Sequence, residues 1–151
     1  MDFHDTSFFQ SGGGSLPTPD EVLELNHLVV GGGRGTVRFE HLNLVVKAGA
    51  ADYLRLEEAQ TLRAMWKAFP AGEVPVPEIF GWRTVGGQNF IYMSLIPGET
   101  LRDAWDSLSH TERLSIRDQL SKVVGKLRTI SPPTTDWVIG MLATIHTPPS
   151  T

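Results

Sequence analysis

The chain contains no cysteine among its 151 residues. This absence excludes disulfide bonds, thiolate metal sites and cysteine nucleophiles, and it is typical of proteins in a reducing compartment. No apolar run approaches the roughly 20 residues of a membrane-spanning helix. Residues 1–11 also lack the basic and apolar stretches of a secretory signal. From these absences we expect a cytoplasmic protein without a membrane partner.

A large excess of charge of one sign is also missing. The formal net charge is −4 and 20% of residues are charged, so the sequence does not predict nucleic acid as a partner. With 40% apolar residues, a chain of this length is expected to form one globular domain. The histidines are scattered, without the spacing of a zinc site, so we expect no metal ligand among them. They are His4, His27, His41, His110 and His146.

The first two thirds of the chain predict an antiparallel sheet. Residues 1–21 are rich in glycine and proline and are expected to form a flexible leader. After them, β-branched and aromatic residues form strand candidates that are separated by turn residues. The last two candidates are joined by Gly86-Gly87, a strong signal for a tight hairpin turn. The five expected strands span residues 25–30, 36–40, 44–47, 78–84 and 88–96.

One helix is expected between the third and fourth strands, over residues 53–69. Its apolar side chains recur at helical spacing, and Asp52 is placed to act as the N-cap. A short helix is expected over residues 99–105, after the last strand. The sequence therefore predicts an α+β fold in which one helix packs on the sheet and further helices follow.

A long helix is expected after Ser109. Ser109 and Glu112 have the spacing of a capping box, in which each side chain bonds the other's backbone amide. An apolar stripe follows at helical spacing and extends to about residue 129. Residues 141–151 show no periodicity and are expected to be a disordered tail.

Lys47 and Glu58 are the most informative pair of residues. Lys47 ends an apolar strand candidate, and Glu58 lies eleven residues later in the expected helix. A strand lysine oriented by a helix glutamate is how kinase-like folds hold the phosphates of a nucleotide. The alternative is a lysine that extends its amine to solvent beside a solvated glutamate.

A glycine cluster precedes this pair. Glycines let backbone amides approach phosphate oxygens, so Gly31, Gly32, Gly33 and Gly35 are candidates for a loop that covers phosphates. The alternative is a flexible hairpin loop, and the cluster does not match the full protein-kinase glycine pattern. Arg34, within the cluster, is either a phosphate contact or a solvated side chain.

An apolar strand that runs into a Pro-Gly turn occupies residues 90–101. Such a segment suits the hinge between two lobes, where the backbone of Ser94 to Ile96 could bond the edge of an adenine. The alternative is a plain buried strand and its exit turn, which any α+β domain can contain.

In order and spacing, these segments resemble the aminoglycoside phosphotransferase and choline-kinase-like family, particularly its fungal members. The resemblance extends over about residues 25–140. It implies a protein-kinase-like small lobe over residues 22–98 and the start of a helical large lobe over residues 99–140. The segments that carry it are residues 45–47, 58–62, 74–81, 91–101 and 118–120.

The resemblance also implies roles for individual residues. Lys47 would bind the α and β phosphates of ATP, and Glu58 would pair with it. Residues 44–46, including Val46, and Met93 would line the nucleotide pocket. The backbone of residues 94–96 would meet the adenine.

The family's catalytic loop, a histidine followed two residues later by an aspartate, is absent from this chain. His110 and His146 do not fit it, and Asp136-Trp137 lacks the apolar strand that precedes the family's metal-binding aspartate. We therefore expect a truncated family member with no identifiable catalytic residue or magnesium site, at most weak ATP binding, and no phosphotransferase activity alone. Two alternatives are a regulatory or self-associating module, whose exposed lobe face binds a partner protein or a second copy, and a kinase-like fold reused for another small-molecule reaction.

Overall fold

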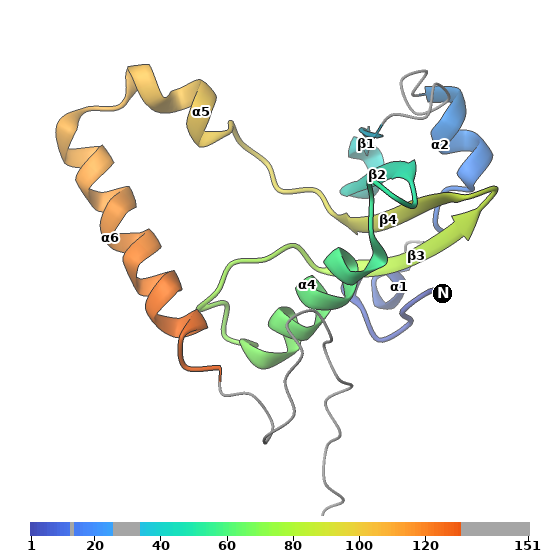
Figure 1. The fold of residues 1–151 in the computed structure, drawn as a ribbon, viewed down its shortest axis with the longest axis horizontal. Helices are drawn as coiled ribbons and strands as arrows, with labels where there is room; N and C mark the ends of the chain where they lie inside the picture. Colours follow the sequence, from blue (N-terminus) through green and yellow to red (C-terminus); the bar gives the residue numbers. More distant parts are fainter. Residues whose placement is uncertain (13, 26–33, 131–151) are drawn as a thin grey trace, which may run out of the picture.

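A computed structural model describes residues 1–12, 14–25 and 34–130. The described part is an α+β structure with an open antiparallel sheet of four strands in the order β1-β2-β4-β3 (Figure 1). The strands are β1 (Arg34–Phe39), β2 (Leu44–Ala50), β3 (Ile79–Val85) and β4 (Gln88–Ser94). The helices are α1 (Ser7–Gln10), α2 (Pro19–Leu25), α4 (Leu56–Ala68), α5 (Leu101–Ala104) and α6 (His110–Leu127), with short 3-10 turns η1 (Glu40–Leu42) and η2 (Trp105–Ser107).

Four of the five predicted strands are present, with bounds shifted by a few residues. The fifth, expected over residues 25–30, is not confirmed: Leu25 ends helix α2, and residues 26–30 lie outside the described part. The predicted hairpin is confirmed, because Gly86 and Gly87 join β3 to β4 with φ angles of 57° and 76°. Positive φ at both central residues identifies the tight two-residue hairpin turn whose twist matches that of the flanking strands.

The strand register assigns each side chain to one face of the sheet. Lys47 of β2 lies opposite Thr36 of β1 and Ile91 of β4, so these three side chains share a face. Val46, the preceding residue, lies opposite Val37 and Tyr92 on the other face. The two faces have separate hydrophobic clusters.

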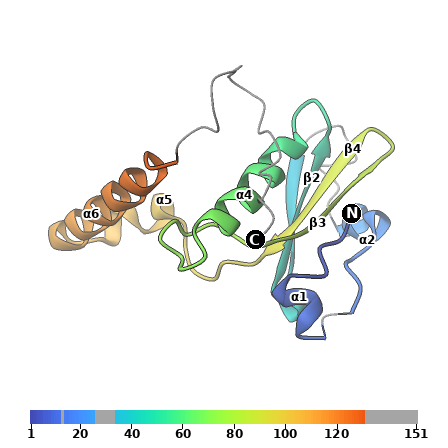
Figure 2. The ribbon, with the colours of Figure 1, turned by 90° about the horizontal axis from the view of Figure 1, so that it is seen from below.

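The expectation of a flexible leader over residues 1–21 is corrected by the structure. Phe8, Leu16 and Val22 are at most 5% exposed and belong to the larger hydrophobic cluster, on the face of Val46. In Figure 2, α1 and α2 lie on one side of the sheet and α4 on the other. The glycines that suggested flexibility lie, in the sequence, between apolar residues that are buried against the sheet. The free energy gained by this burial offsets the conformational entropy that is lost when the segment becomes ordered.

Two polar contacts hold the start of the chain on β3. The Met1 ammonium donates to the Trp82 carbonyl at 2.7 Å, and the Arg83 guanidinium pairs with the Asp2 carboxylate at 3.0 Å. A glycine is required at position 81, where Met1 lies against β3, because a Cβ there would lie 2.6 Å from the Met1 carbonyl oxygen.

Helix α4 begins three residues later than predicted. Its N-cap is Arg55, not Asp52, and no side chain caps it. The reason is Leu54, which is 1% exposed and whose carbonyl accepts a hydrogen bond from the side-chain carboxamide of Asn89 at 2.8 Å. Burial of Leu54 keeps the preceding residues in a turn, and α4 then packs mainly on β3 and β4.

Helices α5 and α6 lie away from the sheet (Figure 1). The predicted capping box is confirmed: the Ser109 hydroxyl accepts from the Glu112 amide at 3.3 Å, and the Glu112 carboxylate accepts from the Ser109 amide at 2.8 Å. Yet no residue of α5 or α6 is buried. The short helix expected over residues 99–105 is a single turn, α5, which continues into η2.

Candidate functional site

The predicted pair of Lys47 and Glu58 is formed. The Lys47 ammonium, on β2, donates to both carboxylate oxygens of Glu58, on α4, at 2.6 and 2.9 Å. The two side chains remain 29% and 39% exposed, respectively. Exposed ion pairs contribute only about 0–1 kcal/mol to stability, so this pair orients the lysine amine more than it holds the fold together.

The ion pair lies at the border between a covered and an open half of one sheet face. Helix α4 covers the half formed by β3 and β4, where Ala59, Ile79 and Ile91 are buried. The half formed by β1 and β2 has no comparable cover among the described residues. Arg34, Thr36 and Arg38 of β1 point to this same face by register and are exposed.

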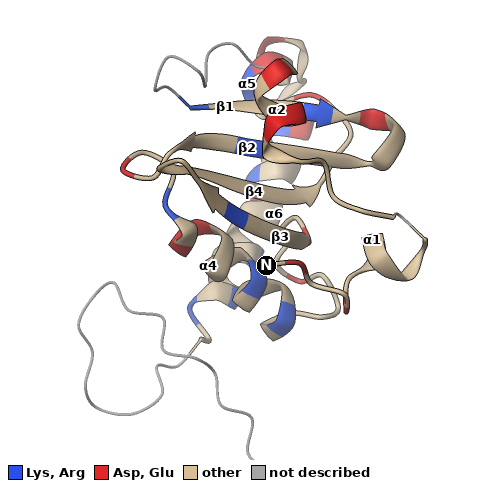
Figure 3. Ribbon diagram, turned by 90° about the vertical axis from the view of Figure 1, so that its right-hand side faces the viewer, with Lys and Arg blue, Asp and Glu red and all other residues tan. Residues whose placement is uncertain are grey.

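This open half carries positive charge. Figure 3 shows basic positions on β1 and β2. Among the described residues, Arg34 and Arg38 form no ion pair with an acidic group, whereas Lys47 is shared with Glu58. Two uncompensated guanidinium groups beside an oriented ammonium are suited to bind a phosphate chain.

Two of the predicted pocket residues lie on opposite faces. Met93 of β4 is opposite Val45 and shares the face of Lys47. Val46 does not: it is fully buried in the cluster that Phe8 and Val22 complete on the other face. The prediction that Val46 lines the same pocket is therefore wrong. Consecutive strand residues point to opposite faces, and Leu44 is excluded for the same reason.

The predicted hinge has little free hydrogen-bonding capacity. The Ser94 amide donates to the Glu78 carbonyl and the Leu95 amide to the Asn43 carbonyl, both at 2.9 Å. Of these three amides, only that of Ile96 forms no hydrogen bond with the described residues, and Ile96 is 66% exposed. An adenine edge could therefore reach Ile96, but Ser94 and Leu95 offer no free amide in this conformation.

The glycine cluster is only partly described. Gly31, Gly32 and Gly33 lie outside the described residues. Gly35 is in strand β1, opposite Ala48, so it belongs to the regular ladder and not to a loop. Among the described residues there is also no group of three histidine or acidic side chains that could hold a metal ion, and no helix is long and apolar enough to cross a membrane.

Thr36 and Arg38 belong to this surface but were not among the residues predicted from the sequence. A signal for them was present, because they alternate with Val37 and Phe39, which are buried. In a half-buried strand the polar residues of such an alternation share a face. What could not be read from the alternation is the register with β2, which pairs Thr36 with Lys47.

Comparison with known proteins adds no relative: no family model, curated protein or solved structure matches the chain. The kinase-like identity of the lobe therefore stays a prediction from the sequence. The fold, the ion pair and the open basic surface are the observations on which a function can be based.

Proposed function

We propose that this chain is a kinase-like module that binds the phosphates of a nucleotide weakly and has no phosphotransferase activity of its own. The observation that carries the proposal is the Lys47–Glu58 pair, which holds an ammonium at 2.6 Å from a helix carboxylate beside the uncovered half of the sheet. In kinase-like folds the same pair must be in place for the lysine to contact the phosphates.

The chemistry of the open half supports phosphate as the ligand. Arg34 and Arg38 add two guanidinium groups, which match phosphate oxygens in bidentate geometry. Thr36, between them, adds a hydroxyl on the same face. Phosphoryl transfer needs in addition a group that positions the acceptor and carboxylates that hold magnesium, and the sequence contains no motif for either.

Isothermal titration calorimetry with Mg-ATP tests the proposal. We expect a dissociation constant of about a millimolar or weaker, an order of magnitude typical of a few exposed contacts, and no ATP turnover. Lys47→Ala should remove the binding, whereas Lys122→Ala, which removes the same charge from α6, should not. Micromolar affinity, measurable turnover, or equal effects of the two variants would contradict it.

A second function, self-association, is favoured by one separate observation. Helices α5 and α6 and the turn between them expose large apolar side chains: Leu101 at 42%, Trp105 at 43%, Leu120 at 53% and Val124 at 44%. Uncovered apolar clusters of this kind favour a partner protein or a second copy.

Light scattering over a range of concentrations distinguishes this function from the first. Self-association predicts a mass that rises with concentration and falls back when Leu120→Gln and Val124→Gln are combined. Val85→Gln is the control, because Val85 is equally exposed, at 52%, but lies on the β3–β4 hairpin. A constant monomer mass at high concentration would rule this function out.

A further inference from the structure

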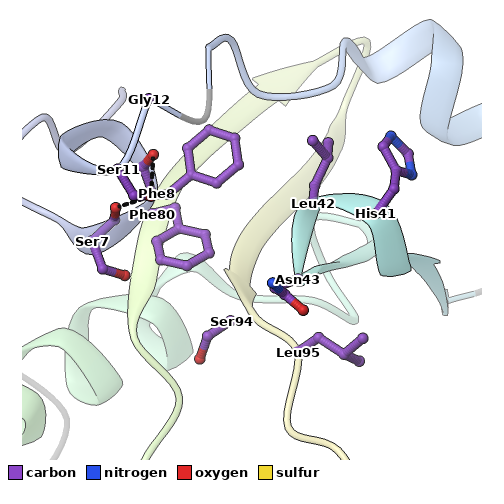
Figure 4. A pocket seen from close by; sticks show the side chains of 10 residues that line it. All are labelled: Ser7, Phe8, Ser11, Gly12, His41, Leu42, Asn43, Phe80, Ser94 and Leu95. Carbon is purple, nitrogen blue, oxygen red and sulfur yellow. Dashed lines mark hydrogen bonds between the residues drawn. The ribbon is translucent and has the colours of Figure 1, made fainter.

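A cavity lies on the other face of the sheet, between helix α1 and the ends of β2 and β4 (Figure 4). Its volume is about 500 Å³, within the range of roughly 300–1,000 Å³ that is typical of small-molecule sites. The side chains of Ser94 and Phe80 point to this face, opposite to Lys47. The cavity is therefore separate from the phosphate surface proposed above.

Two of its walls are apolar. Phe8 of α1 and Phe80 of β3 stand together on one side, with ring centroids 5.2 Å apart and an interplanar angle of 33°. Leu42 and Leu95 lie across the gap in Figure 4. Aromatic walls favour a planar ring, which can stack or meet them edge to face.

Polar groups line the cavity beside these walls. Asn43 holds a left-handed conformation, with φ 48°, and its side-chain amide forms no hydrogen bond with the described residues. The Ser94 hydroxyl accepts from the Glu78 amide at 3.0 Å, which leaves its own proton free to donate. This carboxamide, on an exposed residue, offers a donor and an acceptor side by side.

The lining contains no ammonium, guanidinium or carboxylate group. The one titratable side chain in the lining is the His41 imidazole, which is exposed. An anion would gain no permanently charged partner there and would lose hydration on entry, which is costly. A neutral ligand is favoured for this reason. The Glu78 carboxylate nearby is already bonded to the amide of Ser7 at 3.0 Å, and this bond fixes α1 at the edge of the cavity.

We propose that this cavity binds a neutral planar ring compound that carries a carboxamide or a similar donor–acceptor edge. The ring lies between the phenylalanine and leucine walls, and the edge pairs with the Asn43 carboxamide and the Ser94 hydroxyl. Because α1 contributes to one wall and residues 41–43, Ser94 and Leu95 line the other, the ligand links the first residues of the chain to the sheet.

The test is a two-dimensional amide NMR titration of the full chain with benzamide. We expect saturable shifts, at an affinity of about a millimolar for so small a probe, at the amides around Ser11, Asn43 and Leu95. Benzoate, the charged analogue, and cyclohexane, which has no polar edge, should each bind at least about tenfold more weakly.

Asn43→Gly removes the carboxamide and still suits the positive φ, so we expect about a tenfold loss of benzamide affinity. Gln119→Ala, which removes a carboxamide from exposed α6, is the matched control and should bind as the unchanged chain does. The proposal is overturned if benzamide gives no saturable shift at the cavity or shifts the β1–β2 surface instead. It is also overturned if benzoate binds as well as benzamide, a comparison that does not depend on how Asn43→Gly folds.

Discussion

Every strand of the sheet contributes a buried side chain, whereas no residue of α5 or α6 is buried. The sheet is covered on one face by α1, Leu16 and α2 and on half of the other by α4. Helix α6 has the capping box and the apolar stripe of a well-specified helix but no described element packed against the stripe. A cap decides where a helix begins; packing decides how much stability it adds to the fold. The two regions should therefore respond very differently to comparable substitutions.

The largest difference is expected for leucines. Leu44 is 0% exposed, and Leu120 is 53% exposed. Leu44→Ala should lower the free energy of unfolding by about 2–5 kcal/mol, because it leaves a cavity in the core. Leu120→Ala should change it by less than about 0.5 kcal/mol. Urea denaturation followed by tryptophan fluorescence measures both; similar losses for the two variants would mean that α6 belongs to the same cooperative unit as the sheet.

Glycines should give effects of opposite sign in the two regions. Gly81→Ala would place a Cβ 2.6 Å from the Met1 carbonyl oxygen, so residues 1–2 must move, at a cost of about 1–3 kcal/mol. Gly125→Ala, inside α6, meets nothing within 4 Å and should stabilise that helix by about 0.5–1 kcal/mol. Urea denaturation reports the first and amide hydrogen exchange of α6 the second. Equal tolerance of alanine at both positions would argue against the docking of the first residues on β3.

Loss of the cap should remain local to α6. Ser109→Ala removes the hydroxyl that accepts from the Glu112 amide and should cost the helix about 1 kcal/mol. Carbon chemical shifts should show fraying of its first turn, with no change in the shifts of the sheet. Ser115→Ala, at an exposed position within the helix, is the control and should leave the first turn intact. Shifts that spread to the sheet would show coupling between the regions.

The smallest effect is expected from pH, with one acid as the reporter of each region. Hydrogen bonds from Arg63 hold the pKa of Asp5 below its ordinary value of 3.8, and hydrogen bonds from Ser109 lower the pKa of Glu112 below 4.5. A lowered folded pKa means that each contact is complete above the ordinary value and is lost as pH falls through the folded value. Carboxyl NMR titration should show that Asp5 titrates together with changes in the chemical shifts of Phe3. The ring centroid of Phe3 lies 3.6 Å from the Arg63 guanidinium carbon. Glu112 should titrate together with α6 alone, and Asp5→Asn should abolish only the first transition.

Local signals in the sequence were sufficient for most elements. The alternation around Val37, the Gly86-Gly87 turn and the Ser109–Glu112 spacing each depend on near neighbours, and each is present in the structure. The Lys47–Glu58 contact was expected from the likeness to kinase-like folds, not from a local signal alone, and it is present.

The errors came from contacts that are distant in sequence. Burial of Phe8, Leu16 and Val22 depends on a sheet face that forms much later in the chain, and the nearby glycines gave the opposite signal. The displaced start of α4 depends on Asn89, 35 residues beyond Leu54. Val46 is a different kind of error, since strand alternation alone places it opposite to Lys47.

The most direct test of the central claim is a map of the amide shifts that ATP causes in the full chain. We expect these shifts to concentrate at Thr36, Arg38 and Lys47, to spare the cavity beside α1 and the whole of α6, and to disappear in Lys47→Ala. Shifts that are absent from β1 and β2, or that persist unchanged in Lys47→Ala, would contradict the assignment of this surface to phosphate binding.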